Sequence, residues 1–593
     1  MDYYSFYSGM NMEVYRYLGA HYTKKATTFR TFAPQAQRVE LLLDNKAIEM
    51  NRVYNGSFFE ITIPDVSVGS PYEYRIWFQG RYTDHCDPYG YMMQFRPDHK
   101  SLVWDIDNYT FNDNSWMKKR SDMKDKPLNI YEIHAGSFRK PNKPNTGINK
   151  FYNYEELGEI LIPYLKAGNY NYVEFLPLCE HPCDESWGYQ ITGYFSPTSR
   201  YGMPEQLKKL IDMLHRNNIG VILDFVPVHF ALDEYGLRNY DGSALYEYPS
   251  QDIGLSEWGS CNFMHSRGEV SSFLKSSANY WLKEYHFDGL RIDAVSRIIF
   301  WMGDENRGVN GNAVNFIKTM NKELKERNPG CMLIAEDSTN YPNITDNGKK
   351  ENLGFDYKWD LGWMHDTLDF LALEPAKRSE NYHKLTFSML YFKNENYLLP
   401  LSHDEVVHGK GTIVNKMYGN YEDKIRQARA LYMYMMVHPG KKLNFMGNEI
   451  AQLREWDEKR EQDWHLTESN ILHKHFYDYI TKLNEIYLNN PPFYVLDYDE
   501  SGFYWADCHQ EDKCIYALMR KSDTERCLCI FNFSDKTQKN CKLSIDNVLK
   551  AEILLNSDDV KFGGNSEAVN MNVVGNTITL DMMPYSGIII KLI

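Results

Sequence analysis

Eight short apolar segments recur through the middle of this chain, and they constrain its fold more than any other feature. They cover residues 130–134, 172–177, 220–225, 289–293, 332–336, 354–359, 398–403 and 443–447. Most neighbouring segments are separated by stretches with helical spacing, as in Leu157, Ile160 and Leu161. Strands that alternate with helices form parallel sheets, and eight of them favour an α/β fold with a closed (β/α)8 TIM barrel. An open doubly wound sheet is the alternative, but no Gly-rich phosphate-binding loop follows the first strand.

The two ends of the chain have a different rhythm. Up to about residue 115, alternating stretches such as residues 28–32 and 39–43 are typical of the strands of a β-sandwich. A polar stretch over residues 112–126 is expected to be a linker. Beyond about residue 495 the helical spacing stops, and runs such as residues 527–531 indicate a small all-β domain. The expected domains are an N-terminal β-sandwich over residues 1–115, a barrel over 116–495 and a C-terminal β-sandwich over 496–593.

The composition narrows the class of function. The formal net charge of −15 argues against nucleic acid or an anionic membrane as a partner. Aromatic residues make up 15% of the chain, and their flat amphipathic rings suit the faces of sugars. No secretory signal is visible, and no apolar run approaches the roughly 18 residues that span a bilayer. Because the ten cysteines are scattered and show no metal-type spacing with His, a cytoplasmic protein with reduced thiols is expected.

Charged side chains gather where the barrel strands are expected to end. They are Asp224 and His229 after the third strand, Arg291 and Asp293 at the fourth, Glu336 at the fifth, and His403 and Asp404 at the seventh. In such barrels the active site lies at the carboxyl ends of the strands. A single carboxylate at a strand end is more often a helix cap than a nucleophile. The recurrence of these groups at several ends is what predicts a site.

The residue types fit the chemistry of a glycosidic bond. Retaining enzymes use one carboxylate as nucleophile and a second as acid and then base, about 5–5.5 Å apart. Arg291 and Asp293 share one face of a strand, and the cation is expected to keep Asp293 ionised. Glu336 is the expected acid/base, with its pKa raised by nearby like charge and a dry site. Developing charge and sugar hydroxyls would be held by Asp404, His229 and His403.

Four longer segments carry a resemblance to a known family. They are DFVPVHF at residues 224–230, GLRIDAV at 289–295, IAEDST at 334–339 and LSHDEVVHGK at 401–410. These resemble the four signature segments of the α-amylase superfamily, and in particular of its 1,4-α-glucan (glycogen) branching enzymes. The likeness extends to residues 131–134 and 186–190 and covers nearly the whole chain. The last segment is the most specific for branching.

The resemblance implies a role for each of these residues. Asp293 would be the nucleophile, Glu336 the acid/base and Asp404 the stabiliser of the transition state. Tyr189 would be a stacking platform beneath the reacting glucose, surrounded by Asp224, His229, Arg291 and His403. The family implies an α-glucan substrate such as glycogen or amylose. No cofactor and no metal are expected, and a monomer is the expected form. The terminal domains would resemble a family-48 carbohydrate-binding module and the amylase-type C-terminal sandwich.

Two of the chain's departures from the family pattern bear on ligand binding. Valine stands at position 228, where calcium-binding amylases carry Asn, and its side chain offers no ligand oxygen. No structural calcium is therefore expected there. The N-terminal domain lacks the usual Asp-Phe-Asn-x-x-Trp stretch, because Ala47 follows residues 43–46. A docking or spacer role for that domain is thus as well supported as glucan binding.

Two other functions remain as alternatives. The same carboxylate trio serves α-glucan hydrolases, which differ from branching enzymes in whether water or a glucose hydroxyl reaches the intermediate. A catalytically silent glucan-binding scaffold is the second alternative. Treatment of amylose distinguishes a branching enzyme from a hydrolase, since branching releases few new reducing ends and hydrolysis releases many.

Overall fold

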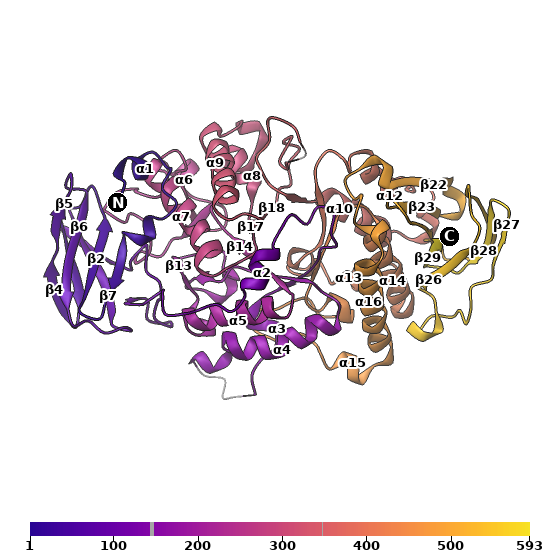
Figure 1. Ribbon diagram of the computed structural model, residues 1–593, viewed down its shortest axis with the longest axis horizontal. Coiled ribbons are helices and arrows are strands. Elements are labelled where there is room, and N and C mark those ends of the chain that lie inside the picture. Colours follow the sequence, from indigo (N-terminus) through magenta and orange to yellow (C-terminus); the bar gives the residue numbers. More distant parts are fainter. Residues whose placement is uncertain (143–146, 347) are drawn as a thin grey trace.

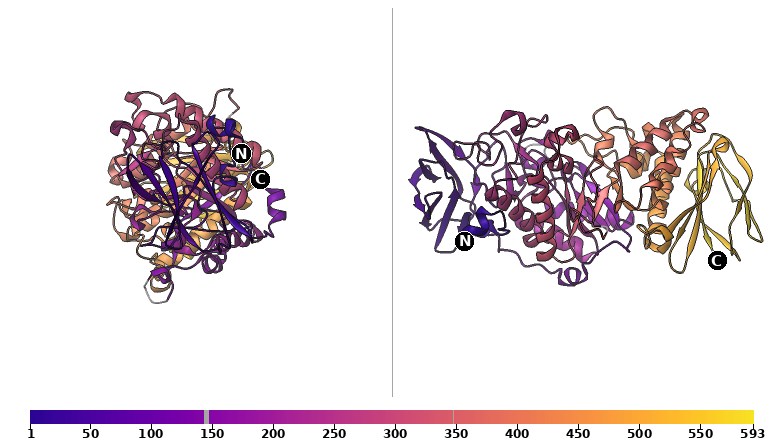
Figure 2. Two further views of the ribbon diagram at one scale, coloured as in Figure 1. Left: turned by 90° about the vertical axis from the view of Figure 1, so that its left-hand side faces the viewer. Right: turned by 90° about the horizontal axis from the view of Figure 1, so that it is seen from above.

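The computed structural model describes residues 1–142, 147–346 and 348–593. The molecule is elongated, with the N-terminal β-sheets at one end, the barrel in the middle and the C-terminal β-sheets at the other end (Figure 1). The view from above shows the same order of the three parts (Figure 2, right). Within the described residues, no helix combines the length and the apolar character needed to cross a membrane.

The central part is a closed barrel of eight parallel strands, as expected. All eight predicted strands are present, with ends shifted by a few residues. In barrel order they are β10 (Asn129–Ile133), β11 (Tyr172–Phe175), β14 (Gly220–Phe225), β17 (Gly289–Ile292), β18 (Met332–Ala335), β19 (Tyr357–Trp359), β20 (Tyr397–Leu401) and β21 (Lys441–Phe445). The competing open sheet is therefore excluded.

The inner faces of the strands change from apolar to charged toward their carboxyl ends. The apolar part is one buried cluster that includes Ile130, Ile222, Ile334, Leu398 and Leu443. Because side chains alternate along a strand, the next position on the same face lies two residues further on. Two residues beyond the three isoleucines, in the same order, stand Glu132, Asp224 and Glu336. The mouth of the barrel is thus lined by ionisable groups above an apolar floor.

Helices cover the outside of the barrel after seven of its strands. They are α4 (Tyr154–Ala167), α5 (Pro204–Arg216), α7 (Gly268–Glu284), α9 (Gly311–Arg327), α10 (Leu361–Ala372), α14 (Tyr421–Val437) and α16 (Ile471–Asn489). Between β18 and β19, the described residues 336–346 and 348–356 form no helix. The regular alternation expected from the sequence is broken at this one position.

The N-terminal part consists of two antiparallel sheets, as predicted. One has the order β1 (Gly19–Tyr22), β2 (Ala26–Phe32), β6 (Phe58–Pro64) and β5 (Asn51–Val53). The other has the order β4 (Lys46–Glu49), β3 (Arg38–Leu43), β7 (Pro71–Phe78) and β8 (Arg81–His85), with β9 (Ser101–Leu102) paired to β7. The sheets lie on the side of the barrel that carries α7, where the backbone N–H of Tyr15 donates to Ser276 Oγ over 3.4 Å.

The segment expected to be a polar linker contains a short helix, α2 (Asn114–Lys119). Trp116 in α2 donates from Nε1 to Asp288 Oδ1 over 2.8 Å, and its ring stacks on His215. Trp116, the one aromatic residue of this stretch, therefore fastens α2 to the barrel. The expected domain boundary at residues 115 and 116 falls inside this helix.

The C-terminal part is all-β, as predicted. Its five-stranded sheet has the order β22 (Phe503–Gln510), β23 (Ile515–Lys521), β24 (Arg526–Asn532), β29 (Ser586–Leu592) and β26 (Ala551–Asn556). A three-stranded sheet has the order β25 (Gln538–Ser544), β28 (Thr577–Met582) and β27 (Met571–Val574). The first sheet contacts α14 of the barrel through β29.

Candidate active site

Arg291 is the centre of the charged group at the mouth of the barrel. Its side chain is 1% exposed, and Nη1 donates to both oxygens of Asp224 at 2.9 and 2.8 Å. The same nitrogen donates to Asp293 Oδ1 over 2.7 Å, and Nη2 lies 3.9 Å from Glu336 Oε2. The guanidinium also lies over the ring of Trp359, 4.4 Å from its centroid. One buried cation therefore connects three carboxylates from three strand ends.

The backbone beyond β17 brings Glu336 toward Asp293. Ala294 has the left-handed φ of 46°, which turns its N–H toward the end of β18. This N–H donates to Glu336 Oε2 over 2.8 Å. The N–H of Glu336 in turn donates to the carbonyl of Ile292 over 3.1 Å. These bonds hold the ends of two neighbouring strands, and with them the two carboxylates, in a fixed relation.

His403 joins a fourth strand end, that of β20, to this group. Its Nδ1 donates to Glu132 Oε1 over 2.6 Å, and its Nε2 lies 3.5 Å from Asp404 Oδ1. The hydroxyl of Tyr189 donates to Asp224 Oδ2 over 2.6 Å and lies 3.2 Å from Nε2 of His403. Asp404, Tyr189 and Asp224 are thus linked around one imidazole. The structure brings seven of the eight site residues predicted from the sequence into one connected group.

The eighth residue, His229, lies in β15 (His229–Ala231) and is joined less directly. Its carbonyl accepts from the hydroxyl of Tyr194 over 2.8 Å, and its ring lies 5.2 Å from that of Trp258. Its Nδ1 is buried without a hydrogen-bond partner among the described residues. Burial lowers the pKa of His229 to about 4, so the imidazole is neutral at pH 7. A neutral imidazole of this kind can still accept or donate one hydrogen bond.

Burial shifts the pKa of both central carboxyls upward. It raises the pKa of Glu336 to about 7, with the charges on Asp293 and Asp404 adding to the effect and Arg291 opposing it. Burial also raises the pKa of Asp293 to about 6, although Arg291 lowers it. The sequence-based expectation that Arg291 keeps Asp293 ionised holds at pH 7, but the desolvation of this carboxyl was missed. Glu336 is the weaker acid, as expected for a proton donor.

The pKa values of His403 and Asp404 are set mainly by charged neighbours. Burial opposes a charge on His403, yet Asp404 and Glu132 outweigh it and raise the pKa of His403 to about 9. Burial also raises the pKa of Asp404, but His403 and Arg291 bring it below the ordinary value. Asp404 is therefore an anion beside a charged imidazole. The site thus holds Glu336, a carboxyl with a raised pKa, beside the anion Asp404 and the cations Arg291 and His403.

Sequence reasoning missed three supporting residues. Glu132 holds both the ring and the backbone N–H of His403, the latter over 2.9 Å. Trp359 packs on Arg291, and Lys358 donates to Asp337 Oδ2 over 2.8 Å directly after Glu336. Glu132 lies in the segment 131–134, which the family resemblance had already marked without a role. The other two contacts join strands that are distant in sequence, and no local pattern indicates them.

Among the described residues, no group of three or more His, Cys, Asp or Glu side chains is arranged to hold a metal ion. Val228, at the position where a calcium ligand was considered, is 2% exposed and belongs to the main apolar core.

Comparison with known proteins places this geometry in a class. The family model for the α-amylase catalytic domain matches residues 161–245 and 257–528, and that for the α-amylase C-terminal all-beta domain matches residues 505–593. A putative alpha amylase from Salmonella typhimurium has the same fold, with a TM-score of 0.73 at 17% identity over 97% of this chain and 100% of that one. Pullulanase from Bacillus acidopullulyticus also has this fold, with a TM-score of 0.72 at 18% identity over 97% of this chain and 74% of that one. The fold and the barrel mouth are those of an α-amylase-type protein.

Closer relatives narrow the class further. The family model described as the alpha-1,4-glucan branching enzyme GlgB N-terminal domain matches residues 3–89. The 1,4-alpha-glucan branching enzyme GlgB of Fusobacterium nucleatum is 40% identical over 578 residues, which cover 95% of this chain and 93% of that protein. The GlgB of Bacillus caldolyticus is 39% identical over 602 residues, which cover 99% of this chain and 89% of that protein. The chain belongs to the GlgB family of 1,4-α-glucan branching enzymes.

Proposed function

We propose that this protein is a 1,4-α-glucan branching enzyme, which cuts an α-1,4 linkage and transfers the released chain to a glucose 6-hydroxyl. Membership in the GlgB family supports the reaction class. The single observation that carries the mechanism is the bridge that Arg291 makes between Asp293 and Glu336. It holds a nucleophile and a weaker acid at adjacent strand ends. That pairing is what a retaining double displacement requires.

In the first step Asp293 attacks the anomeric carbon and forms a covalent glycosyl intermediate. Because Arg291 holds Oδ1, we assign Oδ2 as the attacking oxygen. The bond between C1 and O4 breaks, and O4 of the departing chain takes the proton of Glu336. Oε2 of Glu336 accepts from Ala294, so Oε1 is the oxygen we assign to the proton. Asp404 and His403 would hold hydroxyls of the same sugar as positive charge develops at C1.

In the second step Glu336, now a carboxylate, takes the proton of a 6-hydroxyl on another glucose unit. O6 attacks C1 and displaces Asp293, which restores both carboxyls and leaves an α-1,6 branch. Tyr189 would lie beneath the reacting sugar, where its hydroxyl is held by Asp224. His229 and Trp258 lie side by side near the end of β14 and are suited to contact a neighbouring unit.

Glycogen and amylose are the substrates we propose, and a monomer in the cytoplasm is the form we propose. The ten cysteines, all free thiols, support a reducing compartment. Gel filtration with light scattering tests the oligomeric state, since a mass of twice 69.8 kDa would contradict the monomer.

The test of the function is the product made from pure amylose. We expect iodine staining to fall with few new reducing ends, and enzymatic debranching of the product to release short chains. The Asp293→Ala variant should form no branches while keeping its thermal midpoint, since the residue it removes is the nucleophile. A rise in reducing ends that matches the loss of staining would show a hydrolase instead. Equal activity in Asp293→Ala would show that the trio is not the catalytic site.

A further inference from the structure

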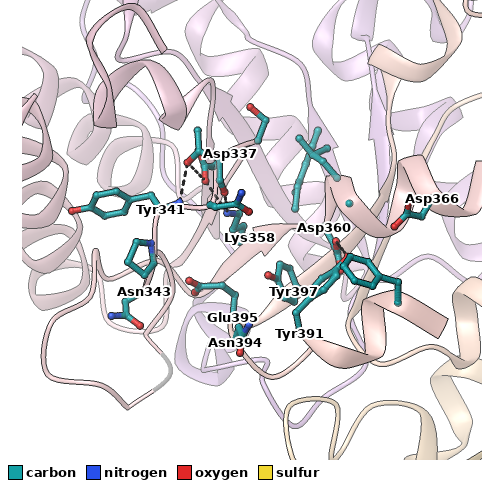
Figure 3. A pocket seen from close by; sticks show the side chains of 18 of the residues that line it. Asp337, Tyr341, Asn343, Lys358, Asp360, Asp366, Tyr391, Asn394, Glu395 and Tyr397 are labelled. Carbon is teal, nitrogen blue, oxygen red and sulfur yellow. Dashed lines mark hydrogen bonds and ion pairs between the residues drawn. The ribbon is translucent and has the colours of Figure 1, made fainter. Parts of the chain in front are cut away.

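A cavity separate from the barrel mouth lies on the outer flank of the barrel, where the described residues after β18 form no helix. Its volume is about 590 Å³. It is bounded by the loop that follows Glu336, by the first turns of α10 and by the segment that leads into β20 (Figure 3). A helix normally covers this flank of a barrel strand. Here the flank is left open, and a ligand could enter it.

The floor of this flank cavity carries polar groups with unused hydrogen-bonding capacity. Lys358 donates to Asp337 Oδ2 and to the carbonyl of Thr339, each over 2.8 Å, which leaves one of its three N–H groups. Asp360 is 2% exposed, and its Oδ1 accepts from the N–H of Trp363 and from the hydroxyl of Tyr391. Its Oδ2 is buried without a hydrogen-bond partner among the described residues. An orphaned acceptor of this kind is costly unless a ligand hydroxyl or water reaches it.

The walls combine aromatic rings with further carboxylates. Phe387 is 52% exposed at the rim, and three tyrosines line the sides, namely Tyr341, Tyr391 and Tyr397. Asp366 adds an acceptor, whereas both oxygens of Glu395 already accept from Ile344 and Thr345. Figure 3 shows Asp366 on α10 at one end of the cavity and Tyr341 near the other. Aromatic faces bind the C–H faces of sugar rings, while carboxylates accept from their hydroxyls.

The charges decide between classes of ligand. Asp337, Asp360, Asp366 and Glu395 outnumber the lysines, and Lys358 is already paired with Asp337. A phosphate or another anion is therefore disfavoured. A neutral molecule with several hydroxyl donors fits both the orphaned Oδ2 of Asp360 and the exposed ring of Phe387.

We propose that the flank cavity is a second binding site for a segment of α-1,4-glucan, distinct from the catalytic mouth of the barrel. The choice of glucan among neutral polyols rests on the proposed function. Because the loop that begins at Glu336 forms one wall, a chain held here lies beside the strand end that carries the proton donor. Such a site would keep a polymer on the enzyme between successive transfers.

Binding of maltohexaose to the full-length Asp293→Ala protein tests this site, since that variant cannot turn the sugar over. Isothermal titration should show two sites. Adding Asp366→Asn and Phe387→Ala should abolish one of them. The matched control, Asp369→Asn with Leu390→Ala, changes one aspartate and one large apolar residue at exposed positions outside the cavity, and both sites should persist. An equal number of sites in the two substituted proteins, or a single site in Asp293→Ala itself, would overturn the proposal.

A second variant tests the orphaned acceptor directly. Asp360→Asn keeps the oxygen that caps α10 but replaces Oδ2 by an amide that cannot accept. We expect binding at the flank cavity to weaken roughly tenfold. In the catalytically competent protein the KM for amylose should rise with kcat unchanged. Unchanged affinity in Asp360→Asn would contradict the assignment. Absence of branches in the product of the unsubstituted protein, with two maltohexaose sites intact in Asp293→Ala, would instead remove the proposed function and leave this site standing.

Discussion

At the scale of single residues, Asp293 and Glu336 share one cation but hold their protons with different strength. Both side chains are partly exposed, yet desolvation raises the pKa of Asp293 to about 6 and that of Glu336 to about 7. The ordinary pKa of Asp is already below that of Glu, and Arg291 donates directly to Asp293 while it lies 3.9 Å from Glu336. The positions of these residues at strand ends could be predicted from the sequence. The size of the desolvation effect could not, since it depends on what packs around them.

The pKa order predicts a bell-shaped pH dependence. Activity requires Asp293 ionised, so kcat/KM should rise with pH through about 6, and it requires Glu336 protonated, so kcat/KM should fall above about 7. The optimum should lie between these values. Initial rates on amylose at low substrate, from pH 5 to pH 9, measure both limbs. A plateau that continues above pH 8 would contradict Glu336 as the proton donor.

At the scale of elements, the loop after β18 replaces a helix and is held by a buried ion pair. Lys358 in β19 fastens Asp337 and Thr339, so the chain directly after Glu336 has a fixed path. The sequence predicted both strands, because their apolar runs are local. It could not predict the missing helix or the pairing of Lys358 with Asp337, which lie 21 residues apart.

Removal of one partner of this pair should destabilise the protein. Lys358→Met leaves Asp337 buried and unpaired, and we expect a loss of about 3–5 kcal/mol in the free energy of unfolding. Urea unfolding followed by fluorescence measures it. The double variant Lys358→Met, Asp337→Leu should recover most of that loss, because no charge is left unpaired. If the single variant is as stable as the parent, the pair does not hold the loop.

The contact of His215 in α5 with two buried aspartates should make the stability of the protein depend on pH. His215 of α5 lies between Asp113 and Asp288, at 2.8 and 2.9 Å. Burial opposes its charge, but the two carboxylates raise its pKa to about 9. This stabilisation is full below the unfolded pKa of about 6.5 and is lost as pH rises through about 9. It amounts to roughly 3 kcal/mol.

Thermal midpoints measured at pH 6.5 and 9.5 check the effect of His215. The parent should lose stability over this interval, and His215→Gln should lose clearly less, because the titrating group is gone. His383→Gln is the control, since His383 is exposed and its removal should leave the pH dependence of the parent intact. Parallel curves for the parent and His215→Gln would contradict the charged imidazole.

At the scale of the whole molecule, the C-terminal sheets are joined to the barrel by buried arginines. Arg429 of α14 donates to the carbonyl of Ser557 over 2.6 Å, and Arg378 donates to that of Phe533 over 2.7 Å. From the other side Arg520 donates to the carbonyl of Val437 over 2.6 Å. We propose domains over residues 1–115, 116–495 and 496–593, with the last two forming one folding unit.

A chain that ends at residue 495 should therefore fail to fold. It would expose the apolar face of α14 and leave Arg429 and Arg378 without their acceptors. We expect it to be insoluble, or to have a thermal midpoint lowered by more than 10 °C, while the full chain expressed in parallel is soluble. Differential scanning fluorimetry measures this. A soluble 1–495 protein with an unchanged midpoint would show that the barrel folds independently.

The sequence by itself determined the eight barrel strands, the two flanking β-domains and the residues at the strand ends, because each of these follows from a pattern within a few neighbouring residues. Only the tertiary structure decided how Arg291 divides its bonds among the carboxylates, which proton each carboxyl holds, and that a hollow remains beside β18. These properties depend on burial and on contacts between distant segments, and periodicity contains no information about either.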